Sequence, residues 1–221
     1  MNNAKIEKAR VAGIDITQVF KANFSYTLPM GEHHSLSGSK LVNKVIGDWK
    51  VAGLFTLQSG TPFSIFSGRA TLNRSSRSGN NTADTSLTLS QLQNLFQFRQ
   101  TGNGPYFVAA SAIGSDGRAV APDGTAAFTG QVFTQPGAGT IGTMQKALLN
   151  GPGEWDFDFM ASKEVKVSDT KSFQLRMDST NFFNHTTYYV GDQTLTSTTF
   201  GKVTSQYYGN RLIQFALYFK F

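Results

Sequence analysis

The segment that most restricts the fold of this chain is its last nine residues, IQFALYFKF. In a β-strand, the side chains of alternate residues point to opposite faces. One face of this segment would carry only large apolar side chains, those of Ile213, Phe215, Leu217, Phe219 and Phe221. Because a chain terminus frays unless it is tied down, this row must rest on something apolar. Protein core and lipid are the two candidates.

Composition favours a β-rich fold and excludes several function classes. The chain has 221 residues with 19 Phe, 22 Gly and no Cys, and its formal net charge is +6. Phe is enriched in strands and Gly in turns. The basic residues are scattered, without the stripe expected of a nucleic-acid binding protein. No apolar run approaches the ~18 residues of a membrane helix, and the N-terminus does not resemble a secretory signal.

Five other segments repeat the two-residue alternation of the terminal segment. The clear ones are residues 18–28, 49–58, 155–167 and 173–180, and a weaker one is residues 63–67. The turn SDTK, residues 168–171, joins two strands whose apolar residues are all odd-numbered. Paired residues on one face then have numbers with an even sum, so we expect an odd number of loop residues, three or five.

Short turns alternate with long connections at residues 29–48, 69–154 and 185–210. Compact domains seldom contain structureless loops longer than ~15 residues, whereas outer-membrane barrels combine short periplasmic turns with long extracellular loops. The sequence therefore predicts an all-β fold, an antiparallel transmembrane β-barrel segment of about six strands, with its apolar face on lipid. Since this is fewer than the roughly eight strands of the smallest barrels, we expect an incomplete barrel, from a fragment or a truncated gene product.

This pattern divides the chain into residues 1–17, an N-terminal remnant or incoming loop, and residues 18–221, the barrel segment. Phe221 would lie at the periplasmic boundary, where Lys163 and Lys220 could extend into the headgroups.

Within the long connection 69–154, the segment LSQLQNLFQF has apolar residues at helical spacing after Thr88 or Ser90 as a possible N-cap. We expect one small helix there, with short strands at PYFV and GQVF.

Several motifs resemble one receptor family. The stretch GDWKVAGLFTLQSGTPFSI matches through Gly47, Trp49, Gly53, Gln58, Ser59, Gly60, Thr61, Pro62 and Phe63, and GQVFTQPGAGTIGTMQKALLNGPG through Phe133, Pro136, Gly139, Gly142, Gly151 and Pro152. DFMASK and STNFFNHTTY match through Asp158, Phe159, Ser162, Lys163, Asn181, Phe183, Asn184 and His185. TFG and NRLIQFALYFKF complete a pattern that resembles TonB-dependent outer-membrane receptors of the Oar-like group, which carry a carboxypeptidase-regulatory-like domain before the barrel.

The resemblance implies the C-terminal part of a receptor that imports a large or scarce ligand with energy from the inner membrane. Its partners would be outer-membrane lipid, the outer-membrane assembly machinery and, in the full-length receptor, a plug and TonB. The apolar row Phe215, Leu217, Phe219 and Phe221 resembles the signal that the assembly machinery reads. The ligand and its binding residues stay unknown. A passive porin or structural outer-membrane protein, and a secreted β-sandwich adhesin, are the alternatives.

Residues that could suggest catalysis or metal binding are better explained by a barrel. Asp156 and Asp158 could act as paired carboxylates, but they fall on the lumen-facing parity. His33, His34 and His185 have no carboxylate at a ligand spacing. We therefore predict no catalytic residue, no enzyme activity, no cofactor and no metal. Near the outer ends of the last two strands we predict an interfacial girdle of tyrosines, formed by Tyr188, Tyr189, Tyr207 and Tyr208.

Deleting Phe221 from the full-length receptor should lower the amount assembled in the outer membrane far more than Lys220→Ala does. The terminal aromatic side chain is available for docking before the barrel closes. If Phe221 only anchors the strand in lipid, its burial contributes about 1.5–3 kcal/mol and Phe221→Leu should restore assembly. Surface levels of the deletion, Leu and Tyr variants decide this. Rescue by Tyr alone supports aromatic recognition, and equal rescue by both contradicts it.

Overall fold

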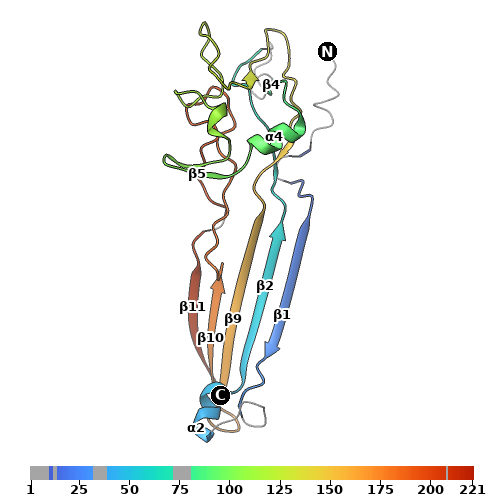
Figure 1. The fold of residues 1–221 in the computed structure, drawn as a ribbon. Coiled ribbons are helices and arrows are strands. Elements are labelled where there is room, and N and C mark those ends of the chain that lie inside the picture. The colour runs from blue at the N-terminus through green and yellow to red at the C-terminus, as the bar shows by residue number, and fades with distance from the viewer. Residues whose placement is uncertain (1–9, 12–13, 32–38, 72–80, 208) are drawn as a thin grey trace. The chain divides into compact units, whose positions relative to one another are not determined.

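A computed structural model describes residues 10–11, 14–31, 39–71, 81–207 and 209–221, which form two compact units (Figure 1). The sheet unit comprises Val19–Gln58, Glu154–Thr187 and Tyr208–Phe221. The loop unit comprises Met1–Gln18, Ser59–Gly153 and Tyr188–Tyr207. Each unit is therefore assembled from segments that are far apart in the sequence.

The sheet unit contains five antiparallel strands in the order β1-β2-β9-β10-β11, with β1 and β11 at the two edges. The strands are β1 (Val19–Thr27), β2 (Trp49–Gln58), β9 (Glu154–Lys166), β10 (Ser172–Thr180) and β11 (Leu212–Lys220). Long antiparallel strands joined by long connections are the fold class predicted from the sequence, and that prediction is confirmed.

The pairing register places most of the large apolar residues of the five strands on one face. Phe20 lies opposite Leu57, and Phe173 lies opposite Phe219. Because the side-chain period is two, a slip of one residue in any pair would move the apolar side chains of that strand to the other face. Five residues, 167–171, separate the β9 and β10 strands, which confirms the odd loop length.

Residues 63–67, predicted as a strand of the sheet, belong instead to the loop unit. There β3 (Pro62–Phe63) pairs with β8 (Leu149–Asn150). Phe63, Ser64 and Ile65 are all buried, so both parities of the segment pack on protein and neither is free to face lipid. The sheet therefore has five strands rather than about six.

Without that strand, the connections are distributed differently between the two ends of the sheet. We call the end with Lys166, Ser172 and Lys220 the turn end, and the end with Gln58 and Glu154 the loop end. The connection 28–48 joins β1 to β2 at the turn end, beside the 167–171 turn. The segments 59–153 and 181–211 both leave from the loop end.

The turn-end connection contains α2 (Lys40–Ile46), a helix that the sequence analysis did not predict. Ser39 caps it, because the Ser39 side-chain oxygen accepts a hydrogen bond from the Val42 amide at 3.4 Å. Among the described residues, no helix is long and apolar enough to cross a bilayer.

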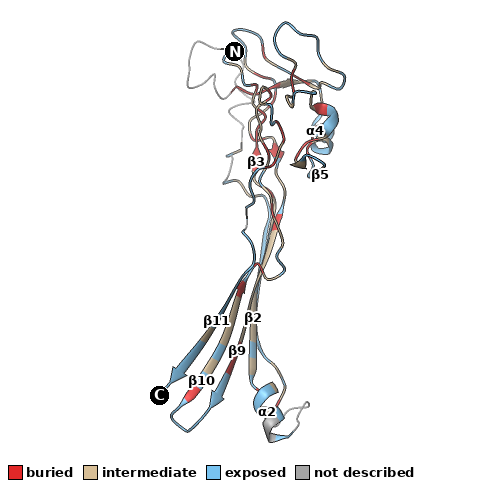
Figure 2. Ribbon diagram, turned by 90° about the vertical axis from the view of Figure 1, so that its left-hand side faces the viewer, coloured by how far each residue is buried: buried red, intermediate tan, exposed pale blue. Residues whose placement is uncertain are grey.

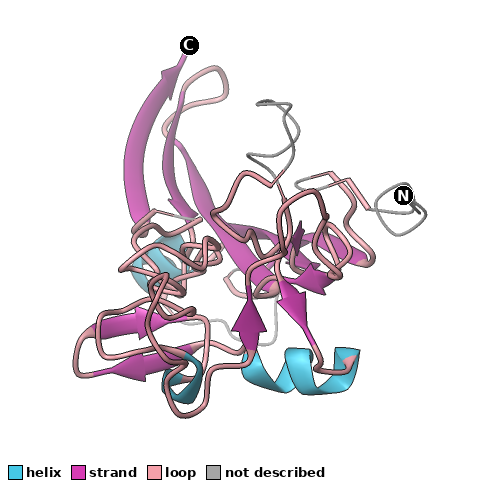
Figure 3. Cartoon of the chain, turned by 90° about the horizontal axis from the view of Figure 1, so that it is seen from above, coloured by secondary structure: helices cyan, strands magenta, loops and turns pink. Residues whose placement is uncertain are grey.

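Most of the loop unit consists of loops, which alternate with strands of two or three residues and short helices (Figure 3). The remaining elements are β4 (Asp84–Thr85), α4 (Leu89–Leu95), β5 (Arg99–Thr101), β6 (Gly104–Tyr106), η1 (Ala110–Ala112) and β7 (Phe133–Thr134). The small helix predicted in residues 89–96 is confirmed as α4. Thr88 is its N-cap, and Gln91 completes a capping box with the Thr88 backbone amide.

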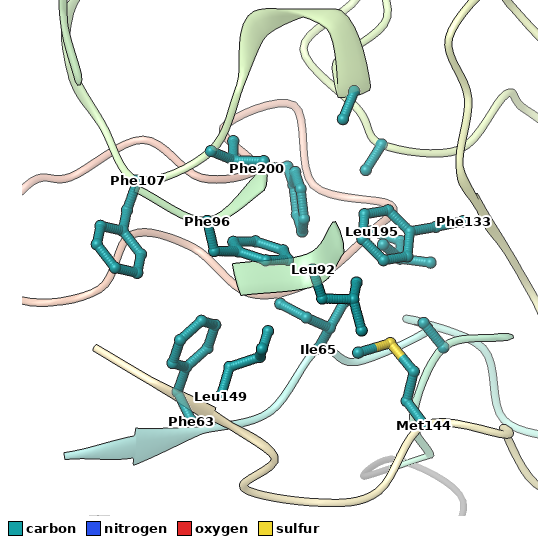
Figure 4. Close-up of a cluster of buried hydrophobic side chains, with 14 of the residues drawn as sticks. Phe63, Ile65, Leu92, Phe96, Phe107, Phe133, Met144, Leu149, Leu195 and Phe200 are labelled. Atoms are coloured by element: carbon teal, nitrogen blue, oxygen red, sulfur yellow. The ribbon is translucent and has the colours of Figure 1, made fainter. Parts of the chain in front are cut away.

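The loop unit has its own hydrophobic core, which the sequence analysis did not predict (Figure 4). Phe96 lies within aromatic contact of Phe63, Phe133 and Phe200, with ring centroids 5.5, 6.0 and 6.4 Å away. Such edge-to-face and tilted pairs add stability beyond the area they bury. Outside the α4 segment the apolar residues of this core are scattered along the sequence, so no other window showed a periodic pattern that could reveal it.

Phe96→Ala should open the loop unit while the sheet stays assembled. Phe96 is 6% exposed, and truncating a buried Phe to Ala costs about 3–5 kcal/mol. In the full-length protein purified in detergent, a protease should then cut within residues 59–153 while heat-resistant migration of the barrel is kept. Leu89→Ala on the same helix is the control, because Leu89 is 47% exposed. Equal cleavage of the two variants would show that this core does not hold the unit together.

Candidate functional site

The apolar face of the sheet unit is exposed over most of its extent. Phe215 and Leu217 are 70% and 69% exposed, and β11 is coloured as exposed along almost its whole length (Figure 2). Soluble monomers rarely leave a contiguous apolar patch of this kind in water. An apolar face made by every second residue is what a barrel wall presents to lipid.

Aromatic rings pack side by side across this face. The ring of Phe55 lies 6.3 Å from those of Phe20 and Trp155. At Gly53, a Cβ atom would lie 2.8 Å from the ring of Phe157, and the rings of Phe24 and Phe157 stack at 6.4 Å. The missing side chain of Gly53 therefore leaves the space that these two rings fill.

Lys163 is the one charged residue on the apolar face of the five strands, and its environment differs from the predicted one. The sequence analysis expected Lys163 to extend into the headgroups, but it is only 7% exposed. Its Nζ donates a hydrogen bond to the Gly47 carbonyl and lies 5.8 Å from the centre of the Trp49 ring. The connection at the turn end thus supplies the polar partner that burial of an ammonium group requires.

The opposite face of the sheet carries charged side chains in pairs. Arg176 donates to both carboxylate oxygens of Asp178 at 2.8–3.0 Å. Lys220 Nζ lies 3.2 Å from Glu164 Oε2, and Ser172 donates to Glu164 Oε1 at 2.6 Å. Exposed pairs of this kind contribute only about 0–1 kcal/mol each. Their presence indicates a face built for water, as in a barrel lumen.

Asp156 and Asp158 lie on this polar face, as predicted. Asp156 lies opposite Thr56 of β2. Asp158 Oδ1 accepts a hydrogen bond from the Asn181 amide at 3.1 Å. The Asn181 side chain in turn donates to the carbonyls of His185 and Gly209 at 2.9 and 3.1 Å. Asp158 and Asn181 therefore tie the β10–β11 connection to β9.

The described residues include one of the three histidines and three of the four tyrosines named in the sequence analysis. His33 and His34 lie outside the described residues, and His185 stacks on Trp155 at 4.2 Å. The part of the chain that the structure describes contains no cluster of three or more His, Cys, Asp or Glu suited to a metal. Three of the four tyrosines predicted near the strand ends belong to the loop unit, namely Tyr188, Tyr189 and Tyr207. The rings of Tyr189 and Tyr207 lie 5.1 Å apart and Tyr208 lies outside the described residues, so the interfacial girdle stays a prediction.

The structure places three of the four predicted assembly residues on the edge strand β11, and Phe221 directly follows this strand. Phe215 and Leu217 of β11 pair with Met177 and Leu175 of β10. The ring of Phe219 lies 4.9 Å from that of Phe173 and 5.8 Å from that of Phe221. The row is therefore continuous and exposed, and its use as an assembly signal stays a prediction.

The loop unit contains a concavity of about 320 Å³ that the sequence analysis did not anticipate. Arg69 and Arg118 both line it. Arg69 pairs with Asp123, and Arg118 lies 3.0 Å from Asp116. Hydrogen bonds from the backbone and side chain of Arg118 hold the pKa of Asp116 below its usual value. No sequence motif links these residues, because only the folded loops bring them together.

Comparison with known protein families matches residues 1–214 to a family described as the outer membrane beta barrel domain. No match was found among curated proteins or among solved structures. The family match agrees with the division of the sheet into an apolar and a polar face, and it supports an outer-membrane location with lipid as the surroundings.

Cysteines on the two faces should react with different reagents. In the full-length protein, cysteines at Phe24 or Phe215 should react with lipid-soluble probes, because their face is apolar in all five strands. Cysteines at the neighbouring positions Asn23 or Gln214 should react with aqueous probes. These neighbours are the matched controls, since they share strand and depth. Equal labelling at the positions on both faces would contradict the interpretation of the sheet as part of a barrel wall.

Proposed function

This chain belongs to the outer membrane beta barrel domain family, and from that premise we propose that it forms the C-terminal part of a TonB-dependent receptor. Such a receptor imports a large or scarce ligand across the outer membrane. The observation that carries the membrane role is the register of the sheet, which places most of the large apolar side chains of five strands on one face.

Two features support a receptor in preference to a passive porin or a structural barrel protein. The motifs that resemble those of Oar-like receptors are residues 47–65, 130–153, 158–163, 179–188, 199–201 and 210–221. In addition, the long segments that leave the loop end contribute to a separately packed unit with a concavity lined by Arg69 and Arg118. A pocket of a few hundred Å³ with convergent polar groups is a usual form of binding site. We assign ligand capture to this unit.

A passive porin is the second candidate, and the polar face of the sheet is the observation in its favour. The charged pairs Arg176–Asp178 and Lys220–Glu164 would suit the lining of a water-filled channel. The two candidates differ in what fills the barrel of the full-length protein. A receptor carries a plug and a contact for TonB, whereas a porin has an open lumen.

Liposomes that contain the purified full-length protein should not swell in arabinose, because a plug closes the barrel of a receptor. A purified periplasmic domain of TonB should bind the same protein in detergent. A known porin is the positive control for swelling, and heat-denatured protein is the negative control for binding. Rapid swelling together with no TonB binding would contradict the receptor proposal and favour a porin.

A further inference from the structure

The helix α2 is attached to the sheet through residues of the apolar face. Trp49 Nε1 donates a hydrogen bond to the Val45 carbonyl at 3.1 Å, and Lys163 Nζ donates to the Gly47 carbonyl. The carbonyls at the end of a helix have no partner within the helix, and a cation there also interacts favourably with the helix dipole. Trp49 and Lys163 lie opposite each other on β2 and β9, on the parity that faces lipid. They therefore hold the end of α2 on the lipid side of the sheet.

Among the described side chains of α2, those of Val42, Lys44 and Val45 are exposed. Val42 and Val45 are 45% and 68% exposed, and residues three apart lie on the same side of a helix. The helix sequence KLVNKVI contains two lysines and no acidic residue. An apolar stripe with flanking cations is the composition of helices that lie in the interface of an anionic membrane.

Neighbouring side chains continue this surface. Tyr26, 55% exposed, lies on the apolar face of β1 at the turn end. Tyr and Trp are enriched where a barrel crosses from hydrocarbon to headgroups. The turn end also carries the tight 167–171 turn, and short turns of outer-membrane barrels are periplasmic. The exposed valines of α2 thus extend the lipid-facing surface toward the periplasmic leaflet.

We propose that α2 is a membrane-interface anchor, which inserts Val42 and Val45 among the headgroups of the periplasmic leaflet. Lys44 would face the anionic groups of these lipids, while Trp49 and Lys163 fix the helix to the barrel wall. This role is independent of energised import and applies equally to a porin. It gives a purpose to a buried lysine on a face that is otherwise free of charge.

A fluorophore at Val45→Cys tests this in the full-length protein, in a background without other cysteines. The protein is reconstituted in phosphatidylglycerol-containing vesicles with nitroxide-labelled lipids. The label should be quenched at least about twofold more than one at Lys50→Cys. Lys50 is the matched control, because it lies on β2 at the same sheet end but on the polar face. Equal quenching at the two positions would overturn the proposal.

A second pair of variants separates anchoring from mere proximity. Trp49→Phe combined with Lys163→Met removes both donors to α2 and keeps apolar side chains, so quenching at Val45→Cys should fall toward the Lys50→Cys value. Heat-resistant migration of each variant shows that the barrel is assembled. Unchanged quenching would overturn the role of the two donors. Protection of Val45→Cys from aqueous thiol reagents in cells, without lipid quenching in vesicles, would show that a protein covers the helix and would also overturn the proposal.

Discussion

The structure depends on one constraint, the separation of apolar and polar side chains by a period of two, maintained in register across five strands. A single strand buries little apolar surface, because its large apolar side chains all project from one side of the backbone. Pairing at Phe55–Phe157 and Phe173–Phe219 aligns these sides into a single surface. Water is a poor solvent for such a surface, so the same alignment that defines the sheet also requires lipid.

Features that depend on local pattern could be predicted from the sequence. Alternation located all five strands, the parity of Val165 and Phe173 required an odd turn, and helical spacing after Thr88 or Ser90 located α4. The segment at Phe63 was misassigned because a short apolar run does not reveal whether lipid or protein will cover it. Its partners in the loop unit are distant in sequence, and only the folded structure brings them together.

The groups that hold the connections in place were the hardest to predict. Lys163 was visible as a break in the apolar face, but its acceptor, the Gly47 carbonyl, lies on a segment with no strand pattern. The same holds for Asp158, whose carboxylate accepts a hydrogen bond from the Asn181 amide. In both cases the sequence shows a charged residue, and its partner is a backbone group that carries no side-chain signal. Propensity and periodicity therefore locate the elements, while tertiary contacts decide how the connections are attached.

A spin-label scan along β2, from Trp49 to Gln58 in the full-length protein in lipid, tests the lipid-facing wall most directly. Collision with oxygen reports lipid, and collision with a water-soluble nickel chelate reports water. A barrel wall predicts that both accessibilities vary with a period of two residues and in opposite phase, with oxygen highest at odd-numbered positions such as Phe55. High nickel accessibility on both parities, or a phase that places Phe55 in water, would contradict the account.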